Sequence, residues 1–149
     1  MKRLKVILAA SIAVLAVGAT PLSAQDLAGE WQFERQARNG IHAGTIIVDR
    51  SGRAKLRARG PVQRYSQCGY VEVVGDKVEI VFTSVKSVVG YSLDHFYCTR
   101  PGDGLLSCYN IDGIGKEDDL FRIGRVGSVS TTAAGRFYDD CPVRESPQV

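Results

Sequence analysis

Alternating apolar and polar residues are the clearest pattern in this chain, and they predict β-strands. Residues 68–74 and 77–85 are rich in Val, Ile, Phe and Tyr, which suit a pleated, half-buried surface. Gly75-Asp76 between them predicts a two-residue hairpin turn. The register that follows places five apolar residues on one face: Val71, Val73, Val78, Ile80 and Phe82. One apolar face is typical of an antiparallel sheet that is buried on one side.

Further strands are predicted along the rest of the chain. Trp31 and Phe33 alternate with polar neighbours in the first strand, and residues 120–126 form the last main strand. Two more hairpins pair residues 44–49 with 54–59, and residues 91–99 with 105–111. About eight short strands separated by turns predict an all-β domain, and the succession of hairpins favours a small antiparallel up-and-down β-barrel.

Residues 1–24 are interpreted as a secretory signal peptide, with a basic start, a short apolar run and small residues near Ala24. The run is short for a membrane span. A lipid anchor is not expected either, because there is no cysteine near the cleavage site. Residues 25–126 then form the barrel domain, and residues 127–149 a C-terminal segment. We expect an exported protein, either periplasmic or secreted.

Removal of the signal peptide changes the charge of the chain. Three of the 19 Lys and Arg residues lie in it, which leaves 16 basic residues against 16 acidic ones. The charges are unevenly distributed, because residues 25–64 hold eight basic and four acidic residues. A neutral mature chain without a recognisable binding motif is not typical of a nucleic-acid-binding protein.

The four cysteines, Cys68, Cys98, Cys108 and Cys141, form an even set, which favours two disulfides in an exported chain. Cys98 and Cys108 flank one predicted hairpin and can bridge it, which leaves Cys68 to hold the C-terminal segment through Cys141. We prefer this pairing. The alternative pairs Cys68 with Cys98 and Cys108 with Cys141.

The opening Leu27-Ala-Gly-Glu-Trp31 resembles the Gly-x-Trp start of the first strand in lipocalin-like (calycin) barrels. A similar Leu-Ala-Gly-x-Trp opening occurs in small bacterial periplasmic protease inhibitors that have an eight-stranded barrel. The resemblance implies that Trp31 closes one end of the barrel and that an arginine near the last strand, Arg122 or Arg125, packs over it. It implies a fold, and no function follows from the fold alone.

Several tyrosines crowd the central strands and are candidates for a small-ligand site. In an open barrel they would line the mouth of an apolar pocket and offer hydroxyl groups to a ligand. In a filled barrel they would be part of the core. The candidate ligand-binding residues are Tyr70, Tyr91, Tyr97 and Tyr109.

A basic strand is the second candidate. Alternation places Lys55, Arg57 and Arg59 on one face, where they can meet an anionic lipid headgroup, polysaccharide or protein. An ordinary solvated face is the alternative, because basic residues also discourage aggregation. The candidate residues for this anionic-partner face are Arg53, Lys55, Arg57 and Arg59.

Catalytic and metal-binding patterns are weak. Ser92, Asp94 and His95 have the residue types of a catalytic triad, but neighbours on one strand point to opposite faces. The two histidines, His42 and His95, do not have the spacing of a zinc site. We therefore expect no enzyme, no metal and no cofactor. Non-catalytic binding of a small ligand or an envelope component is the first functional hypothesis, and a secreted inhibitor or protein-interaction module is the second.

Overall fold

The computed structural model of the protein describes residues 21–86, 92–113, 115–116, 119–128 and 141. The predicted signal peptide, apart from residues 21–24, lies outside these residues, as does most of the C-terminal segment. A 3₁₀ helix, η1 (Ala24–Leu27), precedes nine strands. The strands are β1 (Gly29–Ala37), β2 (Gly40–Val48), β3 (Arg53–Arg59), β4 (Arg64–Val74), β5 (Lys77–Lys86), β6 (His95–Gly102), β7 (Leu105–Asp112), β8 (Gly115–Lys116) and β9 (Phe121–Gly127).

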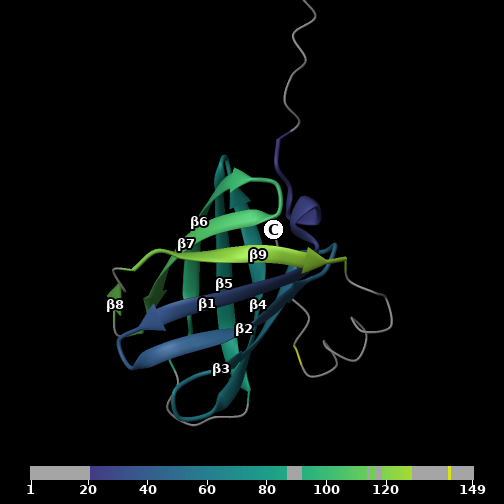
Figure 1. Cartoon of the computed structure of the whole chain (residues 1–149). Coiled ribbons are helices and arrows are strands. Elements are labelled where there is room, and N and C mark those ends of the chain that lie inside the picture. The colour runs from purple at the N-terminus through teal and green to yellow at the C-terminus, as the bar shows by residue number, and fades with distance from the viewer. Residues whose placement is uncertain (1–20, 87–91, 114, 117–118, 129–140, 142–149) are drawn as a thin grey trace, which may run out of the picture.

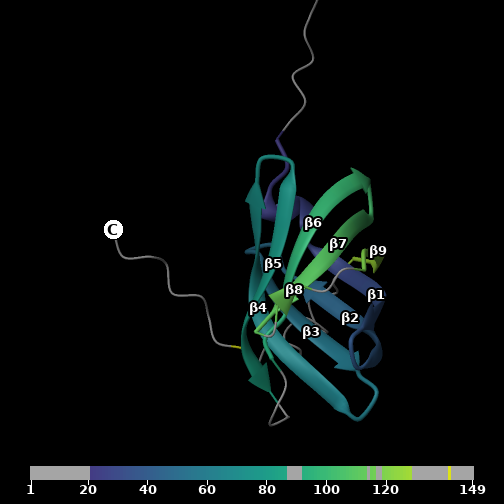
Figure 2. The same cartoon turned by 90° about the vertical axis from the view of Figure 1, so that its left-hand side faces the viewer.

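Eight of these strands close into an antiparallel barrel (Figures 1 and 2). Strands β1 to β7 each pair with the next one, β7 also pairs with β9, and β9 returns to β1. The two-residue strand β8 pairs with the end of β7 beside the barrel. The prediction of an all-β, disulfide-stabilised antiparallel barrel is confirmed.

The β4–β5 hairpin has the predicted register. Val73 pairs with Val78 and Val71 with Ile80, so the two-residue turn is Gly75-Asp76. Gly75 has a φ of 64°, a left-handed conformation that glycine adopts without steric cost. A bulge between Cys68 and Gly69 interrupts the register further along the hairpin, which alternation alone did not predict.

Three strands begin four residues away from the predicted start. Strand β4 begins at Arg64 rather than residue 68. Strand β2 begins at Gly40 rather than residue 44. The apolar pattern does not extend to its first residues, because the buried, inward-facing residue there is the polar His42, which is 3% exposed. Strand β6 begins at His95 rather than residue 91. Tyr91 lies outside the described residues.

Inward-facing side chains of the described strands fill the interior of the barrel and are nearly inaccessible to solvent. Phe96 packs edge-on against Phe33, Phe82 and Phe121 with ring centroids 5.0–5.8 Å apart. A cavity at the Trp31 end has a volume of about 10 Å³, which is at the limit for one water molecule. It is lined by Leu27, Trp31, Val48, Val71, Val78, Ile80 and Leu106.

Close approach of neighbouring strands explains two inward-facing glycines. A Cβ atom at Gly44 would lie 2.1 Å from the Arg57 carbonyl oxygen, and one at Gly69 would lie 1.9 Å from the Val81 carbonyl oxygen. Only glycine lets the backbones approach this closely at these points.

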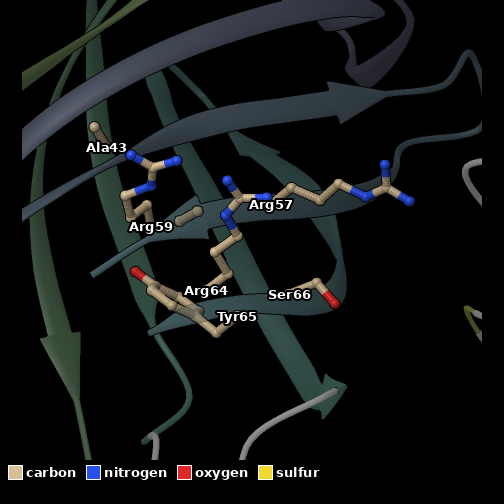
Figure 3. A pocket seen from close by; sticks show the side chains of 7 residues that line it. Ala43, Arg57, Arg59, Arg64, Tyr65 and Ser66 are labelled. Atoms are coloured by element: carbon tan, nitrogen blue, oxygen red, sulfur yellow. The ribbon is translucent and has the colours of Figure 1, made fainter. Parts of the chain in front are cut away.

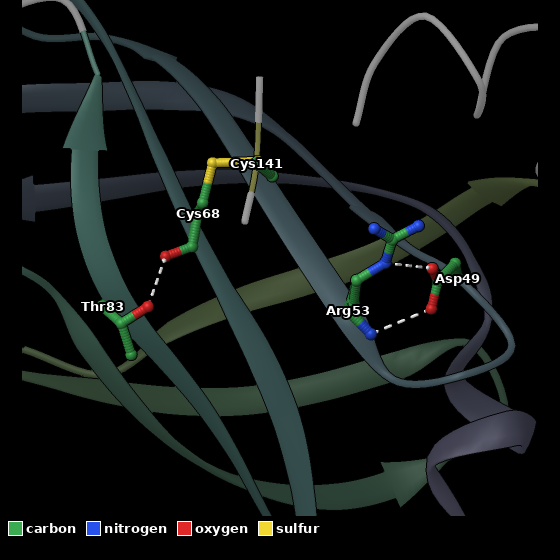
Figure 4. The surroundings of a disulfide bond; sticks show 5 residues. All are labelled: Asp49, Arg53, Cys68, Thr83 and Cys141. Atoms are coloured by element: carbon green, nitrogen blue, oxygen red, sulfur yellow. Dashed lines mark hydrogen bonds and ion pairs between the residues drawn. A yellow bond between two sulfur atoms is a disulfide. The ribbon is translucent and has the colours of Figure 1, made fainter. Parts of the chain in front are cut away.

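The two disulfides join Cys98 to Cys108 and Cys68 to Cys141, as in the preferred pairing. Cys98 and Cys108 face each other across the β6–β7 hairpin and belong to the buried core. Cys68 instead faces outward from β4, where its sulfur bonds Cys141 (Figure 4). Two disulfides are consistent with an exported envelope protein.

The β2–β3 turn is held by the carboxylate of Asp49 (Figure 4). Its Oδ1 accepts hydrogen bonds from the Ser51 and Arg53 backbone N–H groups, both at 2.9 Å, and its Oδ2 accepts one from Arg53 Nε. Partial burial raises the pKa of Asp49, but hydrogen bonds from Ser51 and Arg53 outweigh it, and the net pKa is lowered. The ionised carboxylate therefore stabilises the folded state.

This stabilisation is expected to depend on pH. Because the folded-state pKa lies below the unfolded one, the contribution is present at neutral pH and is lost as the pH falls through the folded-state pKa. Asp49→Asn should therefore lower the free energy of unfolding by about 1 kcal/mol at pH 7. Urea denaturation at pH 7 and at pH 2 tests this, since the difference from the wild type should shrink at pH 2. A difference that stays constant would contradict it.

Candidate functional site

The barrel end at which β1 begins is closed by Trp31, which is 2% exposed. The indole Nε1 donates a hydrogen bond to the Leu27 carbonyl oxygen of η1 at 2.9 Å. The Arg125 guanidinium lies 4.7 Å from the centre of the indole ring and also donates to the Asp26 carbonyl oxygen. Arg125 therefore has the position that the lipocalin resemblance implies. The structural role proposed for Arg122 is wrong, because Arg122 points outward from β9 and is exposed.

A buried polar network closes the opposite end. The Asp94 carboxylate accepts hydrogen bonds from Arg35 at 3.0 Å, Gln67 at 2.9 Å and Asn110 at 2.8 Å. These three side chains come from β1, β4 and β7, no two of which are neighbours in the barrel. The carboxylate therefore joins non-adjacent strands across the interior. All four side chains are at most 5% exposed.

His42 lies beside this network. Its Nδ1 is 2.8 Å from the Tyr65 hydroxyl and its Nε2 is 2.8 Å from Asn39 Oδ1. His95, the other histidine, faces outward and lies 3.0 Å from Glu79. The buried Asp94 and the outward His95 are thus on opposite sides of the barrel wall, as the alternation argument requires.

The three candidate tyrosines that the structure describes, Tyr70, Tyr97 and Tyr109, do not line the interior. Tyr97 and Tyr109 stack on the outer surface, with ring centroids 5.4 Å apart, and His95 stacks on Tyr97 at 4.1 Å. Lys116 lies over the free side of Tyr109 at 4.6 Å. The partly buried Tyr70 follows the outward-facing Cys68 by two residues on β4, so it also faces outward. The interpretation of these tyrosines as the lining of a barrel mouth is therefore wrong, because alternation defines two faces without saying which is inside.

The residues of the basic strand differ in how far they are exposed. Lys55 is only 1% exposed, so its ammonium group is not accessible to a second molecule. It stands opposite Cys68, on the outer face where the Cys68–Cys141 disulfide lies. Arg53 forms an ion pair with Asp49 at 2.9 Å. Arg57 and Arg59 are exposed, so only part of the predicted anionic-partner face is available.

Two further arginines join the exposed ones through the register of the sheet. Arg64 of β4 pairs directly with Arg59 of β3. On the other side, Arg122 of β9 pairs directly with Glu34 of β1. Ala43 of β2 lies between the two pairs, opposite Glu34 on one neighbouring strand and opposite Arg59 on the other. We call this outer surface the arginine groove; its basic residues are Arg57, Arg59, Arg64 and Arg122.

The arginine groove consists of two shallow, adjoining hollows of about 460 and 630 Å³. Both are lined by Ala43 and Arg59, and the second also by Gly44 and Thr45. Small residues on β2 leave the space that the long arginine side chains border. In Figure 3 the Arg59 and Arg64 side chains extend over the same part of β3 and β4, whereas Arg57 extends in another direction.

The pairing of Arg59 with Arg64 is unfavourable on its own, because like charges directly opposite each other on neighbouring strands repel. Within the described part of the chain, Arg59, Arg64 and Arg122 have no carboxylate at ion-pair distance. Glu34 is the acidic residue on the floor of the groove. Guanidinium groups present several N–H donors in a plane, which suits phosphate, sulfate and carboxylate groups.

Sequence reasoning missed the site because it followed a single strand. Arg64 and Arg122 lie on β4 and β9, and only the barrel register brings them to the same surface as Arg59. Among the described residues, no cluster of three or more His, Cys, Asp and Glu side chains is placed to hold a metal ion.

These features define the class: a disulfide-bonded, eight-stranded antiparallel barrel with a filled interior and an arginine-rich outer groove. The architecture is consistent with a lipocalin-like barrel. No known family model matches the chain, and no curated protein matches it significantly.

Among solved structures, the chain is similar to the lipoprotein YedD from Klebsiella pneumoniae, with 20% identity and a TM-score of 0.49. The match covers 86% of this chain and 97% of that one. Within the described residues, no helix is both long and apolar enough to span a membrane.

Proposed function

We propose that this is an exported, non-catalytic binding protein that recognises an anionic group of an envelope component through the arginine groove. The observation that carries the proposal is the exposed Arg59–Arg64 pair, in which two like charges face each other on neighbouring strands. An anionic ligand group between them would relieve their repulsion and accept hydrogen bonds from both.

The filled interior supports a surface site over an internal one. The cavity at the Trp31 end has about 10 Å³, whereas pockets for small molecules are typically about 300–1,000 Å³. The hollows of the arginine groove are in that range but open to solvent. An open groove suits a group on an extended molecule, such as a polysaccharide or a lipid headgroup, better than a small enclosed ligand.

A binding titration with dextran sulfate tests the proposal. The double variant Arg59→Glu/Arg64→Glu should weaken binding at least tenfold, because roughly 1.5–3 kcal/mol is expected from each charge-assisted hydrogen bond. The interaction should also weaken as the salt concentration rises. Uncharged dextran should not bind.

The matched control is Arg50→Glu/Lys77→Glu, which makes the same change in net charge with two exposed residues at the Trp31 end of the barrel. This control should retain most of the affinity for dextran sulfate. Equal losses in both double variants would mean that only the net charge matters, and the arginine groove would then not be the binding site.

A further inference from the structure

Exposed aliphatic side chains gather at the end of the barrel that the Asp94 network closes. Four strand connections lie at this end, between β1 and β2, β3 and β4, β5 and β6, and β7 and β9. Each has one exposed aliphatic residue in it or beside it among the described residues. They are Ile41 at 55%, Val62 at 85%, Leu93 at 38% and Leu120 at 71%.

The β1–β2 and β3–β4 connections touch each other, and arginines lie near both of them in the sequence. A Cβ atom on Gly40 would lie 2.6 Å from Pro61, so the β1–β2 and β3–β4 turns are in contact. In Figure 2 both turns lie at the lower right of the barrel. Ile41 follows Arg38 by three residues, and Val62 lies between Arg59 and Arg64 in the sequence. We call this surface the hairpin edge; it consists of Arg38, Ile41, Arg59, Val62 and Arg64.

We propose that the hairpin edge docks on the surface of an anionic lipid bilayer, with Val62 and Ile41 entering the interface and the flanking arginines binding lipid phosphate groups. Docking goes beyond the proposed function because it needs the aliphatic tips as well as the groove arginines. An experiment can distinguish bilayer docking from binding in the arginine groove, because Val62 does not line the groove.

The pattern of side chains fits a bilayer surface. There, negatively charged headgroups lie directly above hydrocarbon, so a surface with aliphatic tips beside arginines matches both layers. Arginine stems can lie along apolar surface while the guanidinium stays among the headgroups. Val62 is the most exposed of the large apolar residues described, and the arginines on either side of it have no acidic partner there.

Acidic side chains at this end of the barrel would be repelled by an anionic bilayer, so the docking surface is limited to the β1–β2 and β3–β4 turns. Arg38 is in an ion pair with Asp112 at 3.0 Å and remains 47% exposed. Asp119 is exposed next to Leu120, so the β7–β9 connection is a poor partner for an anionic bilayer. Both turns of the hairpin edge lie within residues 25–64, which hold eight basic and four acidic residues.

Vesicle flotation of the mature chain, residues 25–149, tests the inference, because the apolar run of the predicted signal peptide would itself bind vesicles. Vesicles of equal parts phosphatidylglycerol and phosphatidylcholine should bind the protein, whereas pure phosphatidylcholine vesicles should not. Val62→Asp should weaken vesicle binding at least tenfold. Burying a valine side chain contributes about a tenfold gain in affinity, and a carboxylate in its place would oppose insertion into the bilayer. Ile41→Asp should act in the same direction.

Val74→Asp is the matched control, because Val74 is 60% exposed at the Trp31 end of the barrel. It should leave vesicle binding unchanged. Val62→Ser, which removes the aliphatic tip without adding a charge beside Arg59 and Arg64, should weaken vesicle binding and leave both the melting temperature and dextran sulfate binding unchanged. Dextran sulfate binding without vesicle binding would overturn the docking inference and leave the proposed function standing. Loss of both would overturn both.

Two further results would also overturn bilayer docking. If Arg59→Glu/Arg64→Glu abolished vesicle binding and Val62→Asp did not, the vesicles would be acting only as a polyanion. If the protein formed dimers that Val62→Asp separated, and did not float with vesicles, the hairpin edge would be an interface between two copies of this chain.

Discussion

Replacing Asp94 by alanine is expected to lower the free energy of unfolding by about 3–5 kcal/mol, the range found when one member of a buried ion pair is removed. Arg35 would keep its charge inside the barrel, since its side chain is 4% exposed. Gln67 and Asn110 would also lose the oxygen atoms that accept their hydrogen bonds. Urea denaturation followed by circular dichroism measures the effect.

The control for Asp94→Ala is Asp103→Ala. Asp103 is also in an ion pair with an arginine, Arg100, but its side chain is 97% exposed. Exposed ion pairs contribute at most about 1 kcal/mol because water solvates both charges. Similar losses in the two variants would contradict the assignment of Asp94 as the residue that joins β1, β4 and β7 across the barrel.

Replacing Trp31 by alanine is expected to cost about 3–5 kcal/mol, the usual range for removing a large buried aromatic side chain. The change would enlarge the cavity at this end, expose the ring-facing side of Arg125 and leave the Leu27 carbonyl oxygen without its indole donor. Val126→Ala is the control, because Val126 is 53% exposed near the same end and should cost less than about 0.5 kcal/mol.

Fluorescence gives a second measurement at the same residue. Trp31 is the single tryptophan of the chain, so the emission of the folded protein reports on it alone. Because the side chain is 2% exposed, emission should shift to longer wavelength on unfolding. Folded protein with the emission of a water-exposed indole would contradict the burial of Trp31.

The closed ends of the barrel direct attention to its outer surface. Trp31 with Arg125 closes one end and the Asp94 network closes the other. A binding protein of this form would therefore use its outer wall or its loops. The arginine groove lies on the wall and the hairpin edge lies on the adjoining loops, and Arg59 and Arg64 are common to both.

The sequence by itself determined the strands, the turns and most of the barrel. Alternation with strong β-formers predicted the β4–β5 register, because both strands have one apolar and one polar face. Gly75-Asp76 set the length of the turn. An even number of cysteines, with two flanking one hairpin, favoured the pairing that the structure has. These signals are local or depend on residues directly opposite each other.

Only the tertiary structure decided which face is inside and which distant residues meet. Tyr97 and Tyr109 were assigned to the interior, yet they stack outside, because apolar residues occupy both faces of β6 and β7. Lys55 alternates with Arg57 and Arg59 but is buried on the side where Cys141 is attached. Burial and ion pairing depend on neighbours that are remote in sequence, and closure of the barrel determines those neighbours.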